Sequence, residues 1–562
     1  MSDAGLVIRS ALVVDGTGAP PVRADVAIAG GRIGAVGPDL PSGDADVVDA
    51  DGLVLTPGFI DIHTHYDAQL MFEPTASPSS WHGVTTVVTG NCGFTIAPCR
   101  PDDLDWHLSA LARVEGMSVA ALAAGVDFAG GSMGDFLAHL DGRLGVNVAA
   151  LVGHCAIRRL VMGDAASERP ATAAEIAAMQ QVLDAALSEG AAGFSSSQLE
   201  VHADHEGRPV PSNVATAEEI VALASVVAAH PGAVIEFVPE TSLPGFSDAD
   251  RQLLLDIAAA SHAPVNINIV DRFPGYSENW RSNLAVAEQS WEQALALLPS
   301  FRCNPQDMFF SLAETFIFDD VPALRDALRS PQDERDRLLS DPHHRSRMAA
   351  ELASVSRSVS FGWDDVTVAA VRRGEHRHLE GAEVVDAAAA AGVTPLDWVL
   401  DLALAEDLGT VFRIRRGLGE GHRALLEQLV QHPRMLAGTS DAGAHLLTFC
   451  GADFTTRLLA DFVPDPLSLE QAVAILTSRP AAMLGLTDRG IIRAGAAADL
   501  VLFDPERLAV GRTRFVDDFP TGASRLVHDA EGYVAVYVNG RPLLLDGRPT
   551  GDLPGSVVGT RR

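Results

Sequence analysis

The chain has 562 residues and a mass of 59.1 kDa, which indicates about two to four domains unless one large α/β barrel takes up much of the length. Hydrophobic residues make up 47% and charged residues 20%, a composition that excludes a disordered or low-complexity chain. With 74 acidic side chains against 41 basic ones, the net charge is −33, so no nucleic-acid partner and no anionic membrane partner are expected.

The sequence contains no lysine, so all 41 basic side chains are arginines. This excludes a Schiff-base lysine, a phosphate-binding lysine and a lysine general base. It also excludes the carboxylated lysine that bridges two metals in some hydrolases. Any chemistry in this chain must therefore use other side chains.

The cysteines and the N-terminus predict a cytoplasmic protein. The five cysteines are odd in number and scattered, which favours a reducing compartment over a disulfide scaffold. Residues 1–10 lack the apolar run of a signal peptide, and no stretch approaches the roughly 18 apolar residues of a membrane span.

Both ends of the chain predict short β strands, and the middle predicts alternating strands and helices. Val- and Ile-rich segments separated by Gly turns fill residues 1–57, and similar segments follow residue 490. We therefore expect residues 1–57 plus 490–562 to form one small β-sandwich domain. The intervening alternation, over residues 58–489, predicts parallel βα units and an α/β fold, most simply a (β/α)8 TIM-like barrel. A charged helical insertion is expected near residues 320–380.

The strongest chemical signal is the segment Thr56–His65, which ends in His63-Thr64-His65. Side chains alternate along a strand, so two histidines spaced in this way at a strand end face the same side. Two such imidazoles can chelate one transition metal. The pair therefore predicts a metal site.

A second signal is the segment Gly438–His445, which follows an apolar run and contains Asp441. An aspartate at the carboxyl end of a late barrel strand points into the usual catalytic mouth. There it can bind a metal and accept a proton from water. Capping of the next helix is the alternative role.

These motifs resemble the amidohydrolase superfamily, and more closely the N-acyl-D-amino-acid deacylase (D-aminoacylase) family. The resemblance covers most of the chain: residues 83–93 are similar to the family's second-strand motif with its metal-binding cysteine, residues 193–196 to its Gly-x-Ser-Ser strand, and residues 478–503 to its exit from the barrel. By this resemblance His63 and His65 would be metal ligands, Cys92 a thiolate ligand, and Asp441 both ligand and general base.

The sequence departs from the family on two strands, which carry no histidine where the family has metal ligands. Glu236 stands on the first of them and is a candidate oxygen ligand, and Asn268 on the second is a candidate substrate contact. Zn²⁺ is the expected metal, with one ion per chain favoured over two and Co²⁺ or Mn²⁺ as alternatives.

Further candidates for substrate binding lie on four segments. The resemblance implies that Arg457 binds a substrate carboxylate, which a guanidinium does well. His154 follows an apolar strand, Ser196 ends another, and His202 lies in a polar loop that follows it. A surface ion pair for Arg457, a structural bond for His154 and a solvated loop around His202 are the alternatives.

The sequence thus predicts a metal-dependent amidohydrolase that cleaves a C–N amide bond of a small molecule, most simply an N-acyl amino acid. Two alternatives stay open: opening of a cyclic amide, imide or lactone at the same site, and a catalytically degenerate barrel that acts as a binding protein. Substrate identity, stereochemical preference and a homo-oligomeric state are left open by the sequence.

Overall fold

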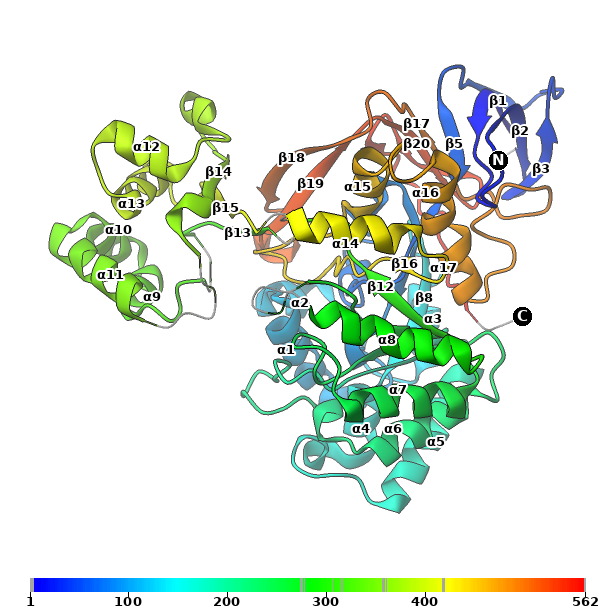
Figure 1. Ribbon diagram of the computed structural model, residues 1–562, viewed down its shortest axis with the longest axis horizontal. Coiled ribbons are helices and arrows are strands. Elements are labelled where there is room, and N and C mark those ends of the chain that lie inside the picture. Colours follow the sequence, from blue (N-terminus) through cyan, green and yellow to red (C-terminus); the bar gives the residue numbers. More distant parts are fainter. Residues whose placement is uncertain are drawn as a thin grey trace.

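The computed structural model describes residues 5–272, 276, 278–305, 307–313, 315, 317–355, 359, 361–416 and 420–559. Figure 1 shows a central body of strands and helices, a β-rich region formed by the chain ends, and a helical unit that projects from the body. The candidate site lies in the central body.

Among the described residues, eight strands form a parallel sheet in the order β16-β12-β11-β10-β9-β8-β7-β6. Their bounds are β6 Phe59–Asp61, β7 Val84–Thr89, β8 Asn147–Gly153, β9 Gly193–Ser197, β10 Val234–Val238, β11 Val265–Ile267, β12 Leu297–Phe301 and β16 Leu436–Ala437. The chain just beyond the two edge strands meets in a parallel bridge between Thr64 and Ala442. The predicted α/β class with a curled parallel sheet is confirmed, and this closure is consistent with the predicted barrel.

Helices follow the strands as expected for βα units: α1 Leu104–Glu115, α2 Val119–Gly125, α3 Met133–Leu140, α4 His154–Met162, α5 Ala173–Ser188, α6 Ala217–Val227, α7 Asp248–Ser261, α8 Asn279–Glu292, α14 Glu420–Gln431, α15 Phe454–Asp461, α16 Leu469–Leu476 and α17 Ser478–Met483. Several of them begin with sequence-encoded caps. At α5, the Thr172 hydroxyl accepts a hydrogen bond from the Glu175 backbone N–H, and the Glu175 carboxylate accepts one from the Thr172 N–H. This reciprocal capping satisfies backbone donors that a helix leaves unpaired.

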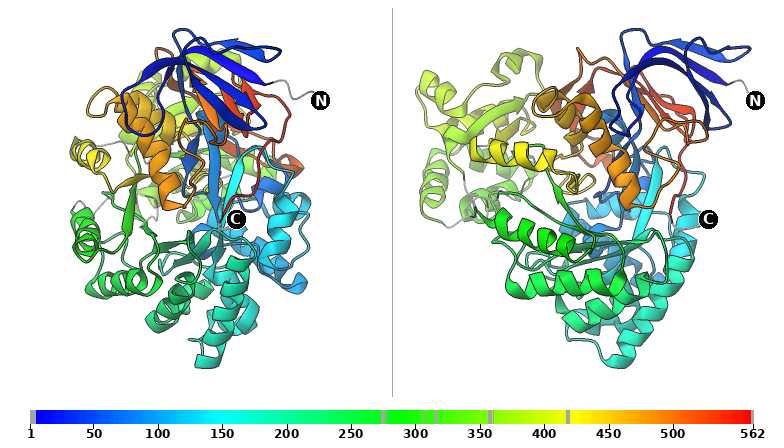
Figure 2. Two further views of the ribbon diagram at one scale, coloured as in Figure 1. Left: turned by 90° about the vertical axis from the view of Figure 1, so that its right-hand side faces the viewer. Right: turned by 45° about the vertical axis from the view of Figure 1, so that its right-hand side comes forward.

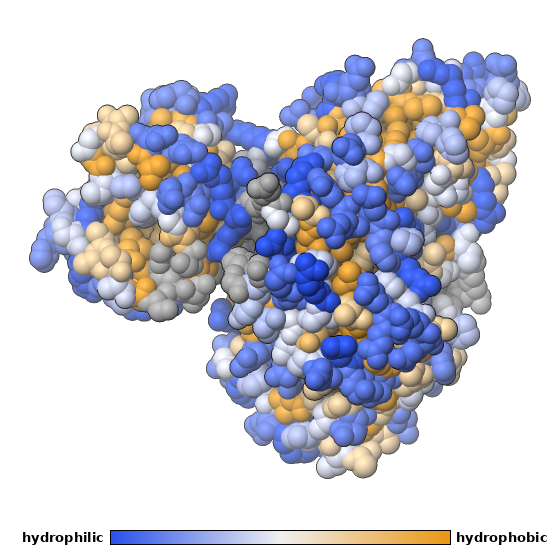
Figure 3. Space-filling model, viewed as in Figure 1, coloured by the Kyte–Doolittle hydropathy of each residue, from blue (hydrophilic) through white to orange (hydrophobic). Residues whose placement is uncertain are grey.

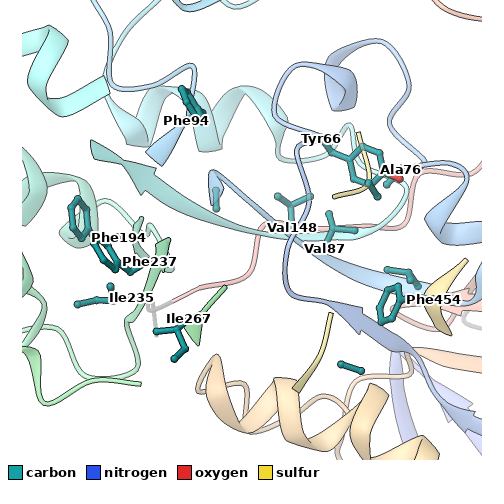
Figure 4. Packing of buried hydrophobic residues seen from close by; sticks show 14 of the residues in the cluster. Tyr66, Ala76, Val87, Phe94, Val148, Phe194, Ile235, Phe237, Ile267 and Phe454 are labelled. Atoms are coloured by element: carbon teal, nitrogen blue, oxygen red, sulfur yellow. The ribbon is translucent and has the colours of Figure 1, made fainter. Parts of the chain in front are cut away.

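Alternation along the strands separates two apolar layers. On β10, Ile235 and Phe237 pack into the main core with Phe194 of β9 and Ile267 of β11, as Figure 4 shows. Val234, on the other face, belongs to a smaller cluster formed by several strands together with α17 and the residues after it. Because side chains two residues apart share a face, Glu236 faces the same side as Val234, one step closer to the carboxyl ends of the strands.

Strands from both chain ends share one mixed sheet of the described residues, in the order β22-β21-β20-β17-β5-β1-β2-β3, with β4 paired to β1. Their bounds are β1 Leu6–Val13, β2 Val22–Ala29, β3 Arg32–Gly37, β4 Asp46–Asp49, β5 Val54–Pro57, β17 Leu500–Phe503, β20 Tyr533–Val538, β21 Arg541–Leu545 and β22 Arg548–Pro549. The two ends join where β5 pairs antiparallel with β17. Figure 2 shows the strands from the two chain ends, blue and red, gathered in one region of the molecule. The predicted sandwich packing stays a prediction.

The helical unit lies between β12 and α14. It consists of β13 Met308–Phe310, α9 Pro322–Leu328, α10 Gln332–Ser340, α11 Pro342–Ser354, β14 Val366–Ala370, α12 Val384–Ala391, α13 Pro395–Ala405 and β15 Val411–Ile414. It has an apolar cluster of its own that includes Phe310, Phe318 and Phe412. It contacts the hairpin of β18 (Ala509–Val516) and β19 (Arg525–Glu531), where Arg512 donates a hydrogen bond to the Val371 carbonyl.

The surface seen in Figure 3 is largely hydrophilic, with smaller apolar areas on the helical unit and over the β-rich region. Within the described ranges no single helix combines the length and apolarity that a membrane crossing requires, although the bent pair α12 and α13 meets the criteria of length and composition when taken together.

Candidate active site

The two predicted metal-binding histidines lie side by side just past the end of β6. Their ring centroids are 5.2 Å apart, and both side chains are almost completely buried. The strand itself ends at Asp61, so the pair lies in the segment beyond it and not within the strand. The Ser440 hydroxyl donates a hydrogen bond to the Asp61 carboxylate (2.7 Å), which ties the end of β6 to the segment after β16.

Cys92 lies in a tight turn (Asn91–Gly93) after β7, with its Sγ 3.4 Å from His63 Nε2. The turn needs glycine beside it, because a Cβ atom on Gly90 would lie 2.4 Å from the Leu151 carbonyl oxygen. Burial raises the pKa of the Cys92 thiol well above its usual value. A bound metal deprotonates such a thiol, so a metal would lower the pKa of Cys92 whereas its buried surroundings raise it.

Asp441 brings a carboxylate to the same place. Its Oδ1 lies 3.3 Å from His63 Nε2 and 3.9 Å from His65 Nε2. Burial alone raises the pKa of Asp441, but the electrostatic interactions with His63, His65 and Arg302 outweigh burial and lower it. The carboxylate is therefore ionised at neutral pH and can accept a proton.

The backbone is left-handed at four non-glycine residues of this site: Cys92 (φ 55°), Thr439 (57°), Asp441 (49°) and His445 (53°). Such conformations cost on the order of 1–3 kcal/mol each and persist where the surrounding structure imposes them. They gather at catalytic and binding sites, so they support a functional role for these turns.

The two histidines differ in protonation. Burial lowers the pKa of His63 to about 4, so this ring is neutral at pH 7. Burial also lowers the pKa of His65, but neighbouring carboxylates, Glu115 foremost, raise it to about 9. Glu115 ends α1, and its Oε1 lies 3.1 Å from His65 Nδ1. A carboxylate on the outer ring nitrogen is the usual partner of a metal-binding histidine.

Glu236 and Asn268 lie on the other side of the His63 ring. Asn268 Nδ2 lies 2.7 Å from His63 Nδ1 and donates a hydrogen bond to Glu236 Oε1 (2.8 Å). Burial raises the pKa of Glu236 to about 8. Asn268 Oδ1 accepts a hydrogen bond from the Ser300 hydroxyl (2.6 Å), so the amide is held at both ends.

The residues fit a bound metal ion. Among the described residues, His63, His65 and Cys92 form a group in which one ligand atom from each lies within 4.8 Å of the others. Zn²⁺ binds nitrogen at about 2.0–2.1 Å and thiolate at about 2.3 Å, so one ion can contact all three after small side-chain movements. Nitrogen and sulfur donors together are the set that zinc prefers.

A pocket of about 430 Å³ opens over this group. Apolar side chains form much of its wall, and two arginines, Arg113 and Arg302, also line it. Arg302 follows directly after β12; its NH1 lies 4.0 Å from Asp441 Oδ2, and its NH2 lies 3.3 Å from the Asp271 carboxylate. The pocket therefore combines a metal-binding group, a carboxylate base and cationic groups.

The structure brings most of the predicted site residues together, but not all. His63, His65, Cys92, Asn268 and Asp441 line the pocket, as does His202 from the polar loop, and Glu236 lies directly behind them. Arg302 was missed although it has the expected signal, a charged residue at a strand end. Glu115 was missed because nothing in the sequence of α1 marks it.

Arg457, His154 and Ser196 do not line this pocket. Arg457 is ion-paired with Asp453 (3.0 Å) on its own helix α15. His154 and Ser196 are fully buried and hydrogen-bonded to each other (2.8 Å), and the other ring nitrogen of His154 lies 2.9 Å from Glu219. None of the three side chains reaches this pocket, so their substrate contacts stay predictions. The bonds of His154 agree with the structural alternative, and Arg457 forms an ion pair with a buried partner instead of a surface one.

Comparison with known proteins identifies the family. A model of the amidohydrolase family matches residues 46–544. The chain belongs to the amidohydrolase family. It is 30% identical to N-acyl-D-aspartate deacylase from Alcaligenes xylosoxydans xylosoxydans, over 99% of this chain and 95% of that protein, and 28% identical to D-aminoacylase from the same organism, over 98% and 97%.

Solved structures agree with this assignment. A D-aminoacylase with a binuclear metal centre superposes with a TM-score of 0.65 at 26% identity, covering 99% of both chains. An N-acyl-D-glutamate deacylase from Bordetella bronchiseptica, complexed with zinc and a phosphonate inhibitor, gives a TM-score of 0.64 at 26% identity, covering 99% of this chain and 100% of that one. The predicted resemblance to this family and the predicted hydrolase class are confirmed.

Proposed function

We propose that this amidohydrolase uses one bound metal ion to cleave the C–N amide bond of a small N-acyl amino acid. The observation that carries the proposal is the meeting of His63, His65 and Cys92 with the Asp441 carboxylate in one pocket. Zn²⁺ suits this donor set, and deacylase relatives at about 30% identity support both the reaction and the metal.

The metal would polarise the amide carbonyl and activate the attacking water. The chain supplies the proton transfers. The Asp441 carboxylate, kept ionised by its cationic neighbours, accepts the proton of the water and then delivers it to the leaving nitrogen. Glu115 holds His65 through its outer ring nitrogen, and the apolar walls limit competing water.

The pocket lining supports a substrate with an apolar acyl group and an anionic amino-acid part. Val114, Leu199, Val238 and Ile269 offer apolar surface, whereas Arg302 lies beside the base. A guanidinium pairs well with a carboxylate, so Arg302 takes over the role that the sequence suggested for Arg457.

The test is Asp441→Asn, assayed on a panel of N-acyl amino acids with zinc supplied. A general base contributes typically about 10²- to 10⁴-fold, so kcat/KM should fall by that factor while the fold and mass stay unchanged. Asp184→Asn, at an exposed residue paired with His230, is the matched control and should keep wild-type turnover. Retention of more than about a tenth of the activity by Asp441→Asn would refute the assignment of the base, since general-base losses are larger than that.

Metal analysis separates an enzyme from a degenerate barrel. The proposal expects close to one ion per chain in freshly purified protein, with loss of that ion in His63→Ala. Near-zero metal, with no uptake of Zn²⁺, Co²⁺ or Mn²⁺, would contradict the proposal and favour a binding protein.

A further inference from the structure

The two ring nitrogens of His63 face different groups. On the Nε2 side lie Cys92 Sγ (3.4 Å) and Asp441 Oδ1 (3.3 Å). On the Nδ1 side lies the Asn268 amide (2.7 Å), with Glu236 Oε1 at 3.7 Å. A metal is bound by one ring nitrogen, along its lone pair, and the other nitrogen is left to a hydrogen-bond partner. An ion shared with Cys92 therefore binds Nε2 and lies away from Glu236.

Both carboxylate oxygens of Glu236 are already engaged. Oε2 accepts a hydrogen bond from the Cys92 backbone N–H (2.8 Å), and Oε1 accepts one from Asn268 Nδ2 (2.8 Å). Its side chain is only 2% exposed. Glu236 thus touches the backbone of one proposed ligand and, through Asn268, the ring of another.

We propose that Glu236 and Asn268 are not metal ligands but an orienting pair, which holds the Cys92 turn and sets the ring position and proton position of His63. This takes the metal site proposed above as given. It assigns to both residues a role other than the metal and substrate contacts expected from the sequence.

The hydrogen bonds explain how the pair acts. In the structure Asn268 Nδ2 faces His63 Nδ1, so the ring proton is on Nε2, towards Asp441. Metal binding through Nε2 needs the proton on Nδ1, hence an acceptor there. A half-turn of the Asn268 amide presents Oδ1 to His63 instead. This oxygen then also faces Glu236 Oε1, so their hydrogen bond persists only with the direction reversed, donated by a protonated Glu236 carboxyl group. The Ser300 hydroxyl, 2.6 Å from the amide, can donate or accept and so supports both orientations.

The substitution Glu236→Gln distinguishes an orienting role of Glu236 from a role as a direct metal ligand. In Glu236→Gln the side-chain oxygen still accepts from the Cys92 N–H, and its NH2 group can donate to the turned amide of Asn268. If the pair orients His63, zinc affinity stays within about threefold of wild type or increases, whereas loss of a direct ligand weakens it. Asn268→Leu removes the partner of Nδ1 and should weaken zinc binding by about 10- to 100-fold, the usual cost of losing such a group.

The experiment measures the zinc Kd of the metal-stripped full-length protein by competition with a chromophoric chelator, and the visible absorption of the Co²⁺ form. Asn266→Leu is the matched control, because Asn266 lies on β11 only two residues before Asn268, but its amide donates to the Leu298 carbonyl (2.9 Å). Its Kd and Co²⁺ spectrum should equal those of wild type.

A tenfold or greater weakening in Glu236→Gln, or wild-type affinity in Asn268→Leu, would overturn the proposal. Because Glu236→Gln is nearly isosteric, the first arm remains decisive even where Asn268→Leu fails to fold. Zinc affinity is measured without substrate, so this inference and the proposed reaction fail by different results.

Discussion

Replacement of Arg302 by glutamine tests where the substrate carboxylate binds. Arg302 is 13% exposed, lines the pocket, and is braced by the buried carboxylate of Asp271. Hydrogen bonds to charged groups contribute about 1.5–3 kcal/mol, so their loss should lower kcat/KM for an N-acyl amino acid by about 10- to 150-fold. Most of the effect should be on KM, because the contact exists before the reaction begins.

The same substitution also perturbs the base. The guanidinium lies 4.0 Å from the Asp441 carboxylate. At an effective dielectric constant of about 20, two unit charges at that distance interact by about 4 kcal/mol before screening by ions. Loss of Arg302 therefore makes Asp441 easier to protonate and affects every substrate alike.

A neutral substrate analogue separates the two effects. We expect Arg302→Gln to slow hydrolysis of an N-acyl amino acid amide, which lacks the carboxylate, only through the base, and to slow the parent acid by the additional factor. The assay is kcat and KM for both compounds with wild type and variant. Equal losses for acid and amide would refute a direct contact between Arg302 and the carboxylate.

Three further predictions concern metal binding and stability. Cys92→Ser should weaken zinc binding, since thiolate is the softer ligand that zinc prefers, and unchanged affinity in a chelator competition would remove Cys92 from the ligand set. Burial lowers the pKa of His82 to about 4, so the free energy of unfolding should fall as pH drops from about 6.5 towards 4, by up to about 1.4 kcal/mol per pH unit. His82→Gln should reduce this pH dependence in denaturant titrations. An unchanged pH dependence would contradict the prediction. Gly193→Ala places a Cβ 2.0 Å from the Val234 carbonyl oxygen and should lower the free energy of unfolding by about 1–3 kcal/mol or more. The control is Gly374→Ala, whose Cβ would have no atom within 4 Å and which should leave the melting temperature unchanged.

Much of the fold could be predicted because local patterns encode it. Alternating apolar strands and capped helices, such as β9 with α6, indicated parallel βα units. The shared terminal sheet could be suspected only from the likeness of the two ends, since pairing of β5 with β17 joins segments far apart in sequence. Neither pattern determines how a second layer packs on that sheet.

The candidate site likewise contains residues that local sequence patterns predict and residues whose positions depend on tertiary structure. His63, His65 and Asp441 could be predicted because each stands at or just past the end of an apolar strand, and such ends meet at one edge of a parallel sheet. Arg457 does not line the pocket, because its helix follows that edge in sequence but directs its guanidinium to Asp453.

Glu236 marks the limit of the strand argument. The alternation of side chains along a strand correctly predicts that the Glu236 carboxylate lies on the His63 side of β10, but it does not predict which ring nitrogen the carboxylate approaches. Whether a carboxylate binds a metal or holds a histidine depends on a difference of a few ångströms, here between Nδ1 and Nε2. Hydrogen bonds from the Cys92 backbone and the Asn268 amide make that distinction, and both partners lie just past the ends of other strands of the sheet. A ligand set is therefore a tertiary property, which the zinc affinity of Glu236→Gln measures directly.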